Sequence, residues 1–264
     1  MKRRRLFDGD GAVAEAAPLV FLHIPKTAGT SFAGHVAAHF RDDEIAPPYW
    51  GAPASLESAR DKRFVAGHFL LRQAIVPFAG AFLTTFLREP VARVQSQYRS
   101  FHDPAKLNQA WRDRMSAAQR DDFEFAQRAS FDEFILSDRD SLTDHIDNVQ
   151  TAFLADADLK ERAALASAIR NLRTRIGFFG IQERFEDSLE LFRFQTGSDR
   201  LFTLPESEQN PSVAADLGLS TKGRRRLADL VALDVALYAA ARRLFRWRLA
   251  ELRLIRQPLR EMFR

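Results

Sequence analysis

One stretch, residues 20–32, constrains the fold of this chain more than any other. It begins with a continuous apolar run, which is typical of a central parallel strand covered on both faces. A sharp turn of small residues with one lysine, Lys26, follows, and the hydroxyl residues Thr30 and Ser31 then begin a helix. Because a helix N-terminus presents unpaired N–H groups and the positive end of the helix dipole, this unit predicts a loop that binds phosphate.

A second strand–turn–helix unit lies at residues 81–98. Its apolar strand ends at Leu87, Arg88 and Glu89 form the turn, and Pro90 takes the first helical position, where a backbone N–H is not needed. The carboxyl ends of parallel strands meet at the same edge of a sheet, and open α/β sheets bind their ligands there. We therefore expect the two turns to supply two neighbouring anion sites.

The rest of the chain alternates apolar strands with amphipathic helices. This pattern predicts an α/β fold of the P-loop-like, three-layer kind, with a central, mostly parallel sheet flanked by helices. With 264 residues, 46% of them hydrophobic, the chain can bury one large core. We predict a flexible tail at residues 1–17 and a single domain at 18–264, which includes a charged surface insertion at 102–129 and a basic C-terminal helix at 234–264.

Further elements follow from the same patterns. Strands are predicted at residues 63–69 and 175–181, with a short last strand at 201–203. Residues 41–60 contain three prolines and are interpreted as a loop, whereas residues 144–155 are predicted to form a helix. The charged insertion shows no clear period, so we expect it to be irregular.

Composition excludes several classes of protein. The chain has no cysteine, which rules out disulfides, thiolate metal sites and a cysteine nucleophile. It contains no run of about 18 apolar residues, the length that a membrane-spanning helix needs. The N-terminus is basic, but no apolar run follows it, so it resembles neither a secretory signal nor a membrane anchor. These features lead us to expect a cytoplasmic protein.

The order of residues in the first loop differs from that of nucleotide triphosphatases. Their loop reads Gly-x-x-x-x-Gly-Lys-Ser/Thr, with the lysine directly before the hydroxyl residue. Here Lys26 precedes Gly29 by three positions, and no aspartate ends an apolar strand where it would hold magnesium. We therefore expect a phosphate ligand that is handled without a metal, and we predict no metal site.

Both loops resemble the donor-binding motifs of one enzyme family. Residues 23–31, His-Ile-Pro-Lys-Thr-Ala-Gly-Thr-Ser, resemble the 5′-phosphosulfate loop of sulfotransferases that use 3′-phosphoadenosine 5′-phosphosulfate (PAPS). Residues 85–98 resemble the 3′-phosphate motif of the same family, in which an arginine at the strand end and a serine eight residues later bind the 3′-phosphate. Arg88 and Ser96 occupy these two positions.

Weaker similarities place the chain near one branch of that family. Gly67 and His68 match a Gly-His pair of the carbohydrate branch, which is similar to heparan sulfate 2-O-sulfotransferase. Residues 147–151 and 180–185 are fainter matches. The resemblance therefore covers roughly residues 20–190.

The resemblance implies an enzyme that transfers the sulfuryl group of PAPS to a hydroxyl acceptor, a carbohydrate in this branch, and releases 3′-phosphoadenosine 5′-phosphate (PAP). Lys26 would stabilise charge on the bridging and 5′-phosphate oxygens as the sulfate leaves. His68 would take the acceptor proton as general base, with Glu89 as an alternative base or a helix cap. The donor-binding residues expected are Pro25, Lys26, Thr27, Ala28, Gly29, Thr30, Ser31, Arg88, Ser96 and Arg184.

Three polar residues, His145, Asn148 and Gln150, are candidates for the acceptor site. His145 can equally be a surface residue of its helix. From the resemblance, an arginine is expected after Thr151, whereas this chain has Ala152. These residues do not identify the acceptor.

Two other functions stay open on the sequence. The first is a metal-dependent small-molecule kinase of P-loop type, which the residue order of the first loop disfavours. The second is non-enzymatic binding of a polyanion through residues 242–264, which hold eight arginines and two glutamates. The same arginines can also form a solvated helix face or a peripheral contact with an anionic surface such as a membrane. No nucleic-acid partner is expected.

Overall fold

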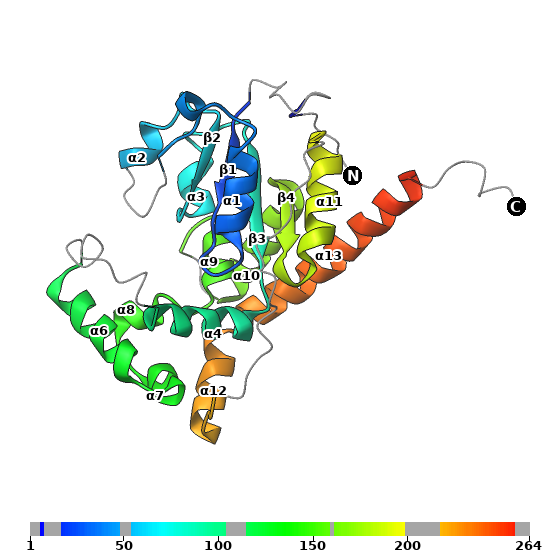
Figure 1. Cartoon of the computed structure of the whole chain (residues 1–264). Coiled ribbons are helices and arrows are strands. Elements are labelled where there is room, and N and C mark those ends of the chain that lie inside the picture. Colours follow the sequence, from blue (N-terminus) through cyan, green and yellow to red (C-terminus); the bar gives the residue numbers. More distant parts are fainter. Residues whose placement is uncertain are drawn as a thin grey trace, which may run out of the picture.

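The computed structural model describes residues 6–7, 17–47, 54–103, 115–158, 161–198 and 217–256. In these ranges four parallel strands form a central sheet flanked by helices (Figure 1), so the predicted α/β fold is confirmed. The strands are β1 (Leu19–Leu22), β2 (Phe64–Gly67), β3 (Phe82–Leu87) and β4 (Ile176–Ile181). Their order across the sheet is β2-β1-β3-β4.

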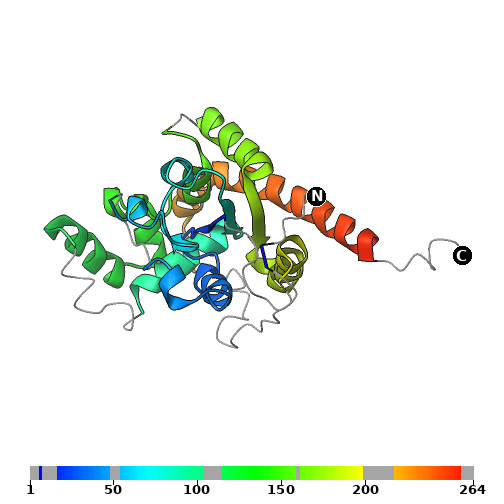
Figure 2. The same cartoon turned by 90° about the horizontal axis from the view of Figure 1, so that it is seen from above.

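Helices cover both faces of this sheet. The helices of the described residues are α1 (Gly29–Ala37), α2 (Ala54–Glu57), α3 (Leu71–Ala74), α4 (Pro90–Phe101), α6 (Ala117–Arg128), α7 (Phe131–Leu136), α8 (Asp140–Thr143), α9 (Val149–Leu154), α10 (Glu161–Thr174), α11 (Phe185–Thr196), α12 (Thr221–Leu230) and α13 (Ala232–Arg256), with short 3-10 helices η1 (Asp42–Glu44) and η3 (Gln182–Arg184). Figure 2 shows α1 and α11 on one face of the sheet, and α3 and α10 on the other. The long helix α13 packs against α9, α10 and α11.

A cluster of phenylalanines holds α1 on the sheet. The ring centroid of Phe32 lies 4.9 Å from those of Phe21 and Phe86, and 5.1 Å from that of Phe192 on α11. All four side chains are fully buried. Because removing a buried phenylalanine costs about 3–5 kcal/mol, this cluster strongly fixes the start of α1 relative to the strands.

The loops after β1 and β3 leave the same edge of the sheet from adjacent strands. β1 pairs with β2 on one side and with β3 on the other, so the strand order reverses beside β1. The connecting segments diverge at such a point and leave a crevice in which ligands bind. Thr84 Oγ1 donates to Val20 O at 3.2 Å and Thr85 Oγ1 to Leu22 O at 2.8 Å, which adds side-chain hydrogen bonds between these two strands.

A second apolar cluster is built by α4, α6, α7, α8 and α12. Part of it comes from residues 102–129, which we expected to be irregular. Instead they include helix α6, which buries Phe123 and Ala126. These two apolar residues are three positions apart among many charges, a pattern too sparse to predict a helix. Residues 104–114 of the insertion lie outside the described residues.

Three other predicted elements differ from the structure or fall outside it. The helix predicted over residues 144–155 begins only at Val149, because Asn148 adopts a left-handed conformation with φ 42° that interrupts it. The loop predicted at residues 41–60 contains the short helices η1 and α2. The last strand predicted at residues 201–203 lies outside the described residues.

The two ends of the described chain both pack on α11. Leu6 and Phe7, part of the predicted tail, donate their N–H groups to Thr196 O at 2.8 and 3.1 Å. At the other end, the predicted basic helix corresponds to α13, and residues 257–264 lie outside the described residues. Within the described ranges, none of the helices combines the length and the apolar character that crossing a membrane requires.

Candidate active site

The loop between β1 and α1 is a tight turn with two residues in the left-handed conformation. Lys26 has φ 70° and Ala28 has φ 67°. A non-glycine residue in this region costs about 1–2 kcal/mol, and strain of this kind collects at functional sites. Thr27 Oγ1 donates to Ile24 O at 2.8 Å, and this buried hydrogen bond stabilises the turn. The Thr27 hydroxyl, which we expected at the phosphate, is therefore committed to the loop itself.

Gly29 begins α1, one residue before the predicted start, and no larger residue fits there. A Cβ atom at this position would lie 2.0 Å from Cδ2 of His23. The His23 ring is buried, and burial together with the charges of His68 and Lys26 lowers the pKa of His23 to about 3. A neutral imidazole thus supports the helix start, and the backbone of Gly29 rests directly on it.

The first turn of α1 has polar groups that fit an anion. Ser31 Oγ is buried and has no hydrogen-bond partner among the described residues, and leaving a buried hydroxyl unsatisfied costs about 1–3 kcal/mol. The side chain of Thr30 is exposed, and those of Pro25 and Lys26 are half-buried. The first N–H groups of a helix have no acceptor within it, and the positive end of the dipole lies there. A phosphate at this point would satisfy the unpaired groups.

Arg88 connects the second loop to the first. Its side chain is buried, and Nη1 donates to Lys26 O at 3.1 Å. Burial lowers the pKa of Arg88, whereas the carboxylates of Glu183 and Glu89 oppose that shift. Glu89 Oε2 accepts from Ala92 N at 2.6 Å and so caps α4, the alternative role that the sequence suggested for it. The guanidinium therefore lies between the two expected anion sites.

His68 directly follows β2, at the same edge of the sheet as both loops. Its Nδ1 lies 2.6 Å from His23 O, and because a carbonyl oxygen only accepts, Nδ1 carries the proton. In the neutral ring Nε2 then holds the lone pair, which is the form a general base needs. Burial lowers the pKa of His68, the hydrogen bond to His23 opposes this, and the charges of His145 and Lys26 lower it further.

Of the three acceptor candidates, His145 is the one whose charge lowers the pKa of His68. Its side chain is exposed, and its ring centroid lies 5.7 Å from that of Phe101. Desolvation by the surrounding atoms and the charge of Arg93 lower the pKa of His145. The exposed imidazole of His145 therefore acts on His68 through its charge.

The side chains of Asn148 and Gln150, which we expected at the acceptor, bond within the protein. Gln150 is 1% exposed; its Oε1 accepts from Arg88 N and its Nε2 donates to Arg88 O, both at 2.9 Å. Asn148 Oδ1 accepts from the N–H groups of Leu233 at 2.8 Å and Asp234 at 3.1 Å, so it caps α13. Three of their four polar atoms bind backbone groups, whereas Nδ2 of Asn148 donates to Asp147 Oδ1 at 2.8 Å.

Asp234 is a site-supporting residue that sequence reasoning missed. It is fully buried, and it accepts from Gln150 N at 3.1 Å and Thr151 N at 2.7 Å. It therefore caps α9, while Asn148 of α9's own N-terminus caps α13. Burial raises the pKa of Asp234, and the charge of Arg93 opposes this. Only its position at a predicted helix start hinted at a capping role.

Sequence reasoning also missed Arg93, although an arginine on the buried face of a helix indicates a buried polar contact. Its side chain is fully buried, and Nη2 donates to His145 O at 3.1 Å and Ile146 O at 3.3 Å. Burial lowers the pKa of Arg93 to about 10, so the group remains charged at neutral pH. It links α4 to the segment that carries His145.

Glu183 holds the second loop from the end of β4. Its Oε1 accepts from Glu89 N at 2.8 Å, and its Oε2 accepts from Tyr238 Oη at 2.6 Å. Burial and the hydrogen bond to Glu183 raise the pKa of Tyr238, so the phenol stays protonated and donates. No sequence pattern links these three residues, which come from distant segments.

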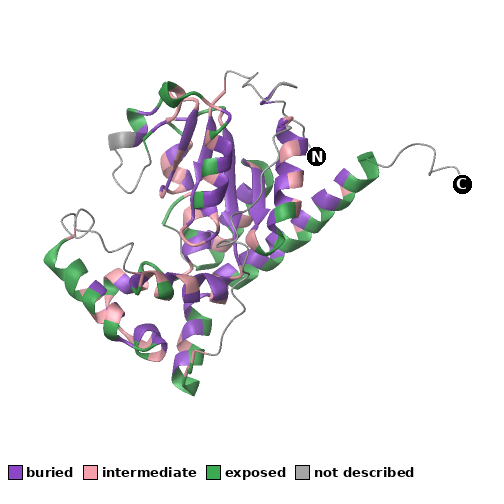
Figure 3. Cartoon of the chain, viewed as in Figure 1, coloured by how far each residue is buried: buried purple, intermediate pink, exposed green. Residues whose placement is uncertain are grey.

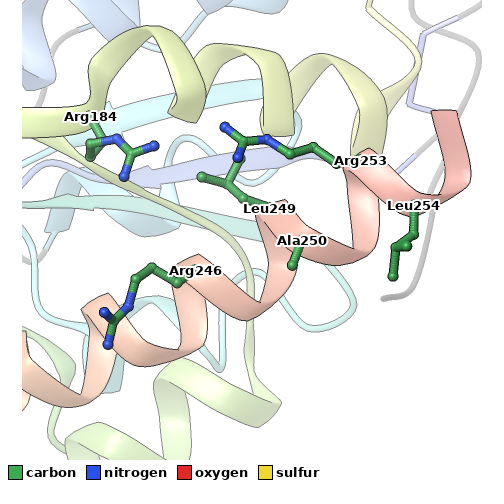
Figure 4. Close-up of a pocket in the computed structure, with 6 residues that line it drawn as sticks. All are labelled: Arg184, Arg246, Leu249, Ala250, Arg253 and Leu254. Atoms are coloured by element: carbon green, nitrogen blue, oxygen red, sulfur yellow. The ribbon is translucent and has the colours of Figure 1, made fainter. Parts of the chain in front are cut away.

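Two of the expected donor-binding residues have less support from their surroundings. Ser96 is half-buried on α4, and in the described part of the chain its hydroxyl makes no hydrogen bond. Arg184 pairs with Asp187, with Nε 2.5 Å from Oδ2, and lines a pocket beside α13 (Figure 4). Among the described contacts, none joins Arg184 to Arg88 or Lys26. Of the expected donor-binding residues, Arg184 therefore has the least support from the structure.

Comparison with known proteins adds no assignment to this site. No protein-family model matches the chain, and no curated protein matches it. Among the described residues, no group of three or more His, Asp or Glu side chains is arranged to hold a metal ion.

Proposed function

We propose that this protein is a sulfotransferase that moves the sulfuryl group of PAPS to a hydroxyl of a carbohydrate acceptor. The observation that carries the proposal is the junction of two loops at adjacent strand ends, where Arg88 Nη1 donates to Lys26 O at 3.1 Å. PAPS has phosphate groups at both its 5′ and 3′ positions, so it requires two anion sites of this kind. The sequence resemblance and this geometry support the same ligand.

The first loop would hold the 5′-phosphate of the donor. The buried Ser31 Oγ, which lacks a partner in the described part of the chain, and the first N–H groups of α1 are suited to an anion. The exposed hydroxyl of Thr30 is suited to one as well. Arg88 and Ser96 would hold the 3′-phosphate, where a guanidinium can donate two parallel hydrogen bonds. The strained backbone of Lys26 and Ala28 would keep the loop in shape before the donor arrives.

The chemistry assigned to the chain is a single in-line displacement. The acceptor hydroxyl oxygen forms a bond to sulfur as the bond between sulfur and the bridging phosphate oxygen breaks. His68 Nε2 takes the hydroxyl proton, which its fixed tautomer and lowered pKa allow at neutral pH. Lys26 stabilises the charge that collects on the departing 5′-phosphate of PAP.

The test measures transfer of labelled sulfate from PAPS to a panel of carbohydrate hydroxyl acceptors, with and without EDTA. We expect transfer that survives EDTA, and we expect calorimetry to detect PAP binding. Loss of activity in EDTA would favour a metal-dependent kinase-like enzyme. Salt-sensitive binding of polyanions without any PAP binding would favour the non-enzymatic alternative.

A histidine variant tests the base. His68→Ala should lower turnover by about 10²–10⁴-fold while PAP still binds, because general base catalysis typically contributes that much. His102→Ala is the matched control, since His102 Nδ1 also contacts a carbonyl, Tyr98 O at 3.0 Å, but lies at the far end of α4. Equal turnover of the two variants would refute the assignment of His68.

A further inference from the structure

The outer half of α13 exposes large apolar side chains that the fold does not use. Among the described residues, five large apolar side chains are strongly exposed, and four of them lie on α13: Val235, Trp247, Leu254 and Ile255. Trp247 is 57% exposed and Leu254 is 65% exposed. Because these two residues are seven positions apart, about two helical turns, they lie in one row along the helix.

The rest of that surface is basic. Between residues 242 and 256 the exposed side chains are five arginines, Trp247, Ala250, Leu254 and Ile255, whereas the one acidic residue, Glu251, is half-buried. We call these exposed side chains the distal face of α13; Figure 3 shows the alternation of exposed and buried positions along this helix. An ordinary solvated helix face mixes both signs of charge with neutral polar residues. The distal face has neither acidic nor neutral polar side chains.

Contacts with α11 leave the distal face positively charged. Arg253 Nη2 lies 3.8 Å from Asp187 Oδ1, and Arg256 pairs with Glu190. Asp187 is shared, because its Oδ2 also pairs with Arg184. These two carboxylates of α11 therefore balance only part of the positive charge of the five distal-face arginines and Arg184.

A pocket of about 510 Å³ lies along this surface, between α13 and the start of α11 (Figure 4). Its lining is Arg184, Arg246, Leu249, Ala250, Arg253 and Leu254. Arg184 and Arg253 extend toward each other over the groove (Figure 4). Guanidinium groups beside an apolar lining are chemically suited to a phosphate that is attached to an apolar body.

We propose that the distal face of α13 is a docking surface for an anionic lipid bilayer. Trp247 and Leu254 would enter the interface, and the flanking arginines would contact phosphate headgroups. Charge complementarity selects an anionic partner, and the exposed apolar row selects a bilayer over a soluble acidic polymer, which arginines alone would bind. Amphipathic helices that lie in the membrane interface combine tryptophan and leucine with basic residues in the same way.

The test uses the full chain and flotation with lipid vesicles. We expect binding to vesicles of phosphatidylcholine mixed with phosphatidylglycerol, and little binding to phosphatidylcholine alone. Arg246→Gln and Arg253→Gln should each weaken binding about fivefold, since one basic residue near an anionic surface contributes about that factor. Trp247→Ser with Leu254→Ser should weaken it by about tenfold or more, because the buried apolar area is lost.

Matched variants control for charge and for stability. Arg224→Gln with Arg225→Gln removes two exposed arginines from α12. Val76→Ser removes an apolar side chain that is 73% exposed and lies outside α13. Both should bind vesicles like the wild type. Thermal unfolding of every variant verifies that the fold is retained, which is expected because all the substituted side chains are exposed.

A spectroscopic measurement gives a second readout. In a Trp50→Phe, Trp111→Phe background, Trp247 is the single tryptophan, and its emission should shift to shorter wavelength with anionic vesicles. Absence of binding to anionic vesicles would overturn the proposal. A second outcome would also overturn it. If the Trp247→Ser, Leu254→Ser variant bound vesicles fully while the arginine variants lost binding to both vesicles and dextran sulfate, the distal face would bind a soluble acidic polymer instead. Neither experiment depends on the donor or on catalysis.

Discussion

The loop after β1 is held mainly by residues near it in the sequence, whereas the loop after β3 is held by side chains from far along the chain. Thr27 bonds to Ile24, three positions away, and Gly29 packs on His23. By contrast, the backbone of Arg88 bonds to a side chain 62 positions away, and that of Glu89 to one 94 positions away. The first loop can form with its own strand and helix, and the second needs the assembled fold.

This difference indicates which substitutions should disturb each of the two proposed anion sites. A substitution in α9 or α13 should disturb Arg88 and spare the loop that contains Lys26. A substitution within the first loop should affect chemistry directly and leave the packing of α9 and α13 intact. Four predictions test this contrast.

The largest effect is expected from Asp234→Ala, which removes the centre of the long-range support. The free energy of unfolding should fall by about 3–5 kcal/mol, because the buried charge of Arg93 loses its counter-charge and two N–H groups of α9 lose their acceptor. Urea denaturation measures the change. Asp229→Ala, at an exposed carboxylate of α12, is the control and should change stability by less than about 0.5 kcal/mol. Equal effects of the two would show that Asp234 is not an anchor.

Lys26→Ala should act on chemistry alone. Turnover should fall by about 10²–10³-fold, the typical effect of removing a group that stabilises developing charge, with little change in stability. Steady-state assays with PAPS and thermal unfolding measure the two effects. Lys62→Ala removes another half-buried lysine, whose Nζ bonds to Asp43 O at 2.9 Å, and should leave turnover unchanged. A drop smaller than tenfold for Lys26→Ala would contradict its role.

Gln150→Leu tests the long-range support of Arg88 more gently. The backbone N–H and C=O of Arg88 lose their partners, and the guanidinium shifts, so PAP affinity should weaken by about tenfold. The KM for PAPS should rise more than kcat falls, since Gln150 acts through Arg88. Gln195→Leu is the control: it removes a buried glutamine bonded to Gly177 O at 3.4 Å and should lower stability without changing PAP affinity. A shared loss of affinity would mean that the effect is not specific.

The smallest expected effect is a shift in a pH profile. The pKa of His68 is lowered from the usual 6.5, so the ring is neutral above its pKa, and kcat/KM should fall with acidification only below pH 6.5. His145 becomes positively charged on acidification, and that charge lowers the pKa of His68. His145→Gln removes it, so the pKa of His68 should rise and the acidic limb should move slightly toward pH 6.5. A limb that stays in place would show that the two imidazoles do not interact.

Local patterns were sufficient to predict the elements that build the site. The apolar run before His23, the turn with Lys26 and the helix start at Pro90 all appear in the structure where short-range sequence places them. They are predictable because strand burial, turn chemistry and helix starts depend on a few neighbouring residues. The bounds of some helices were predicted less accurately. The helix before Ala155 is interrupted at Asn148, whose left-handed conformation is selected by its bonds to α13.

The polar residues of the acceptor stretch show why the rest was not predictable. From their type alone, Asn148 and Gln150 were equally suited to bind a ligand or to pair with backbone. The choice depended on where α13 and Arg88 lie relative to α9, and those segments are separated by 62 to 86 positions. No local spacing contains that information.

The sequence by itself determined the two strand–turn–helix units, the residue types at their turns and the α/β class, since each depends on neighbours in the chain. Only the tertiary structure decided that Arg88 reaches the first loop, that His68 presents Nε2 as its lone-pair nitrogen, and that Asp234 lies buried at the start of α9. These facts arise because a parallel sheet joins distant strand ends at one edge, and burial there forces each polar group to find a partner.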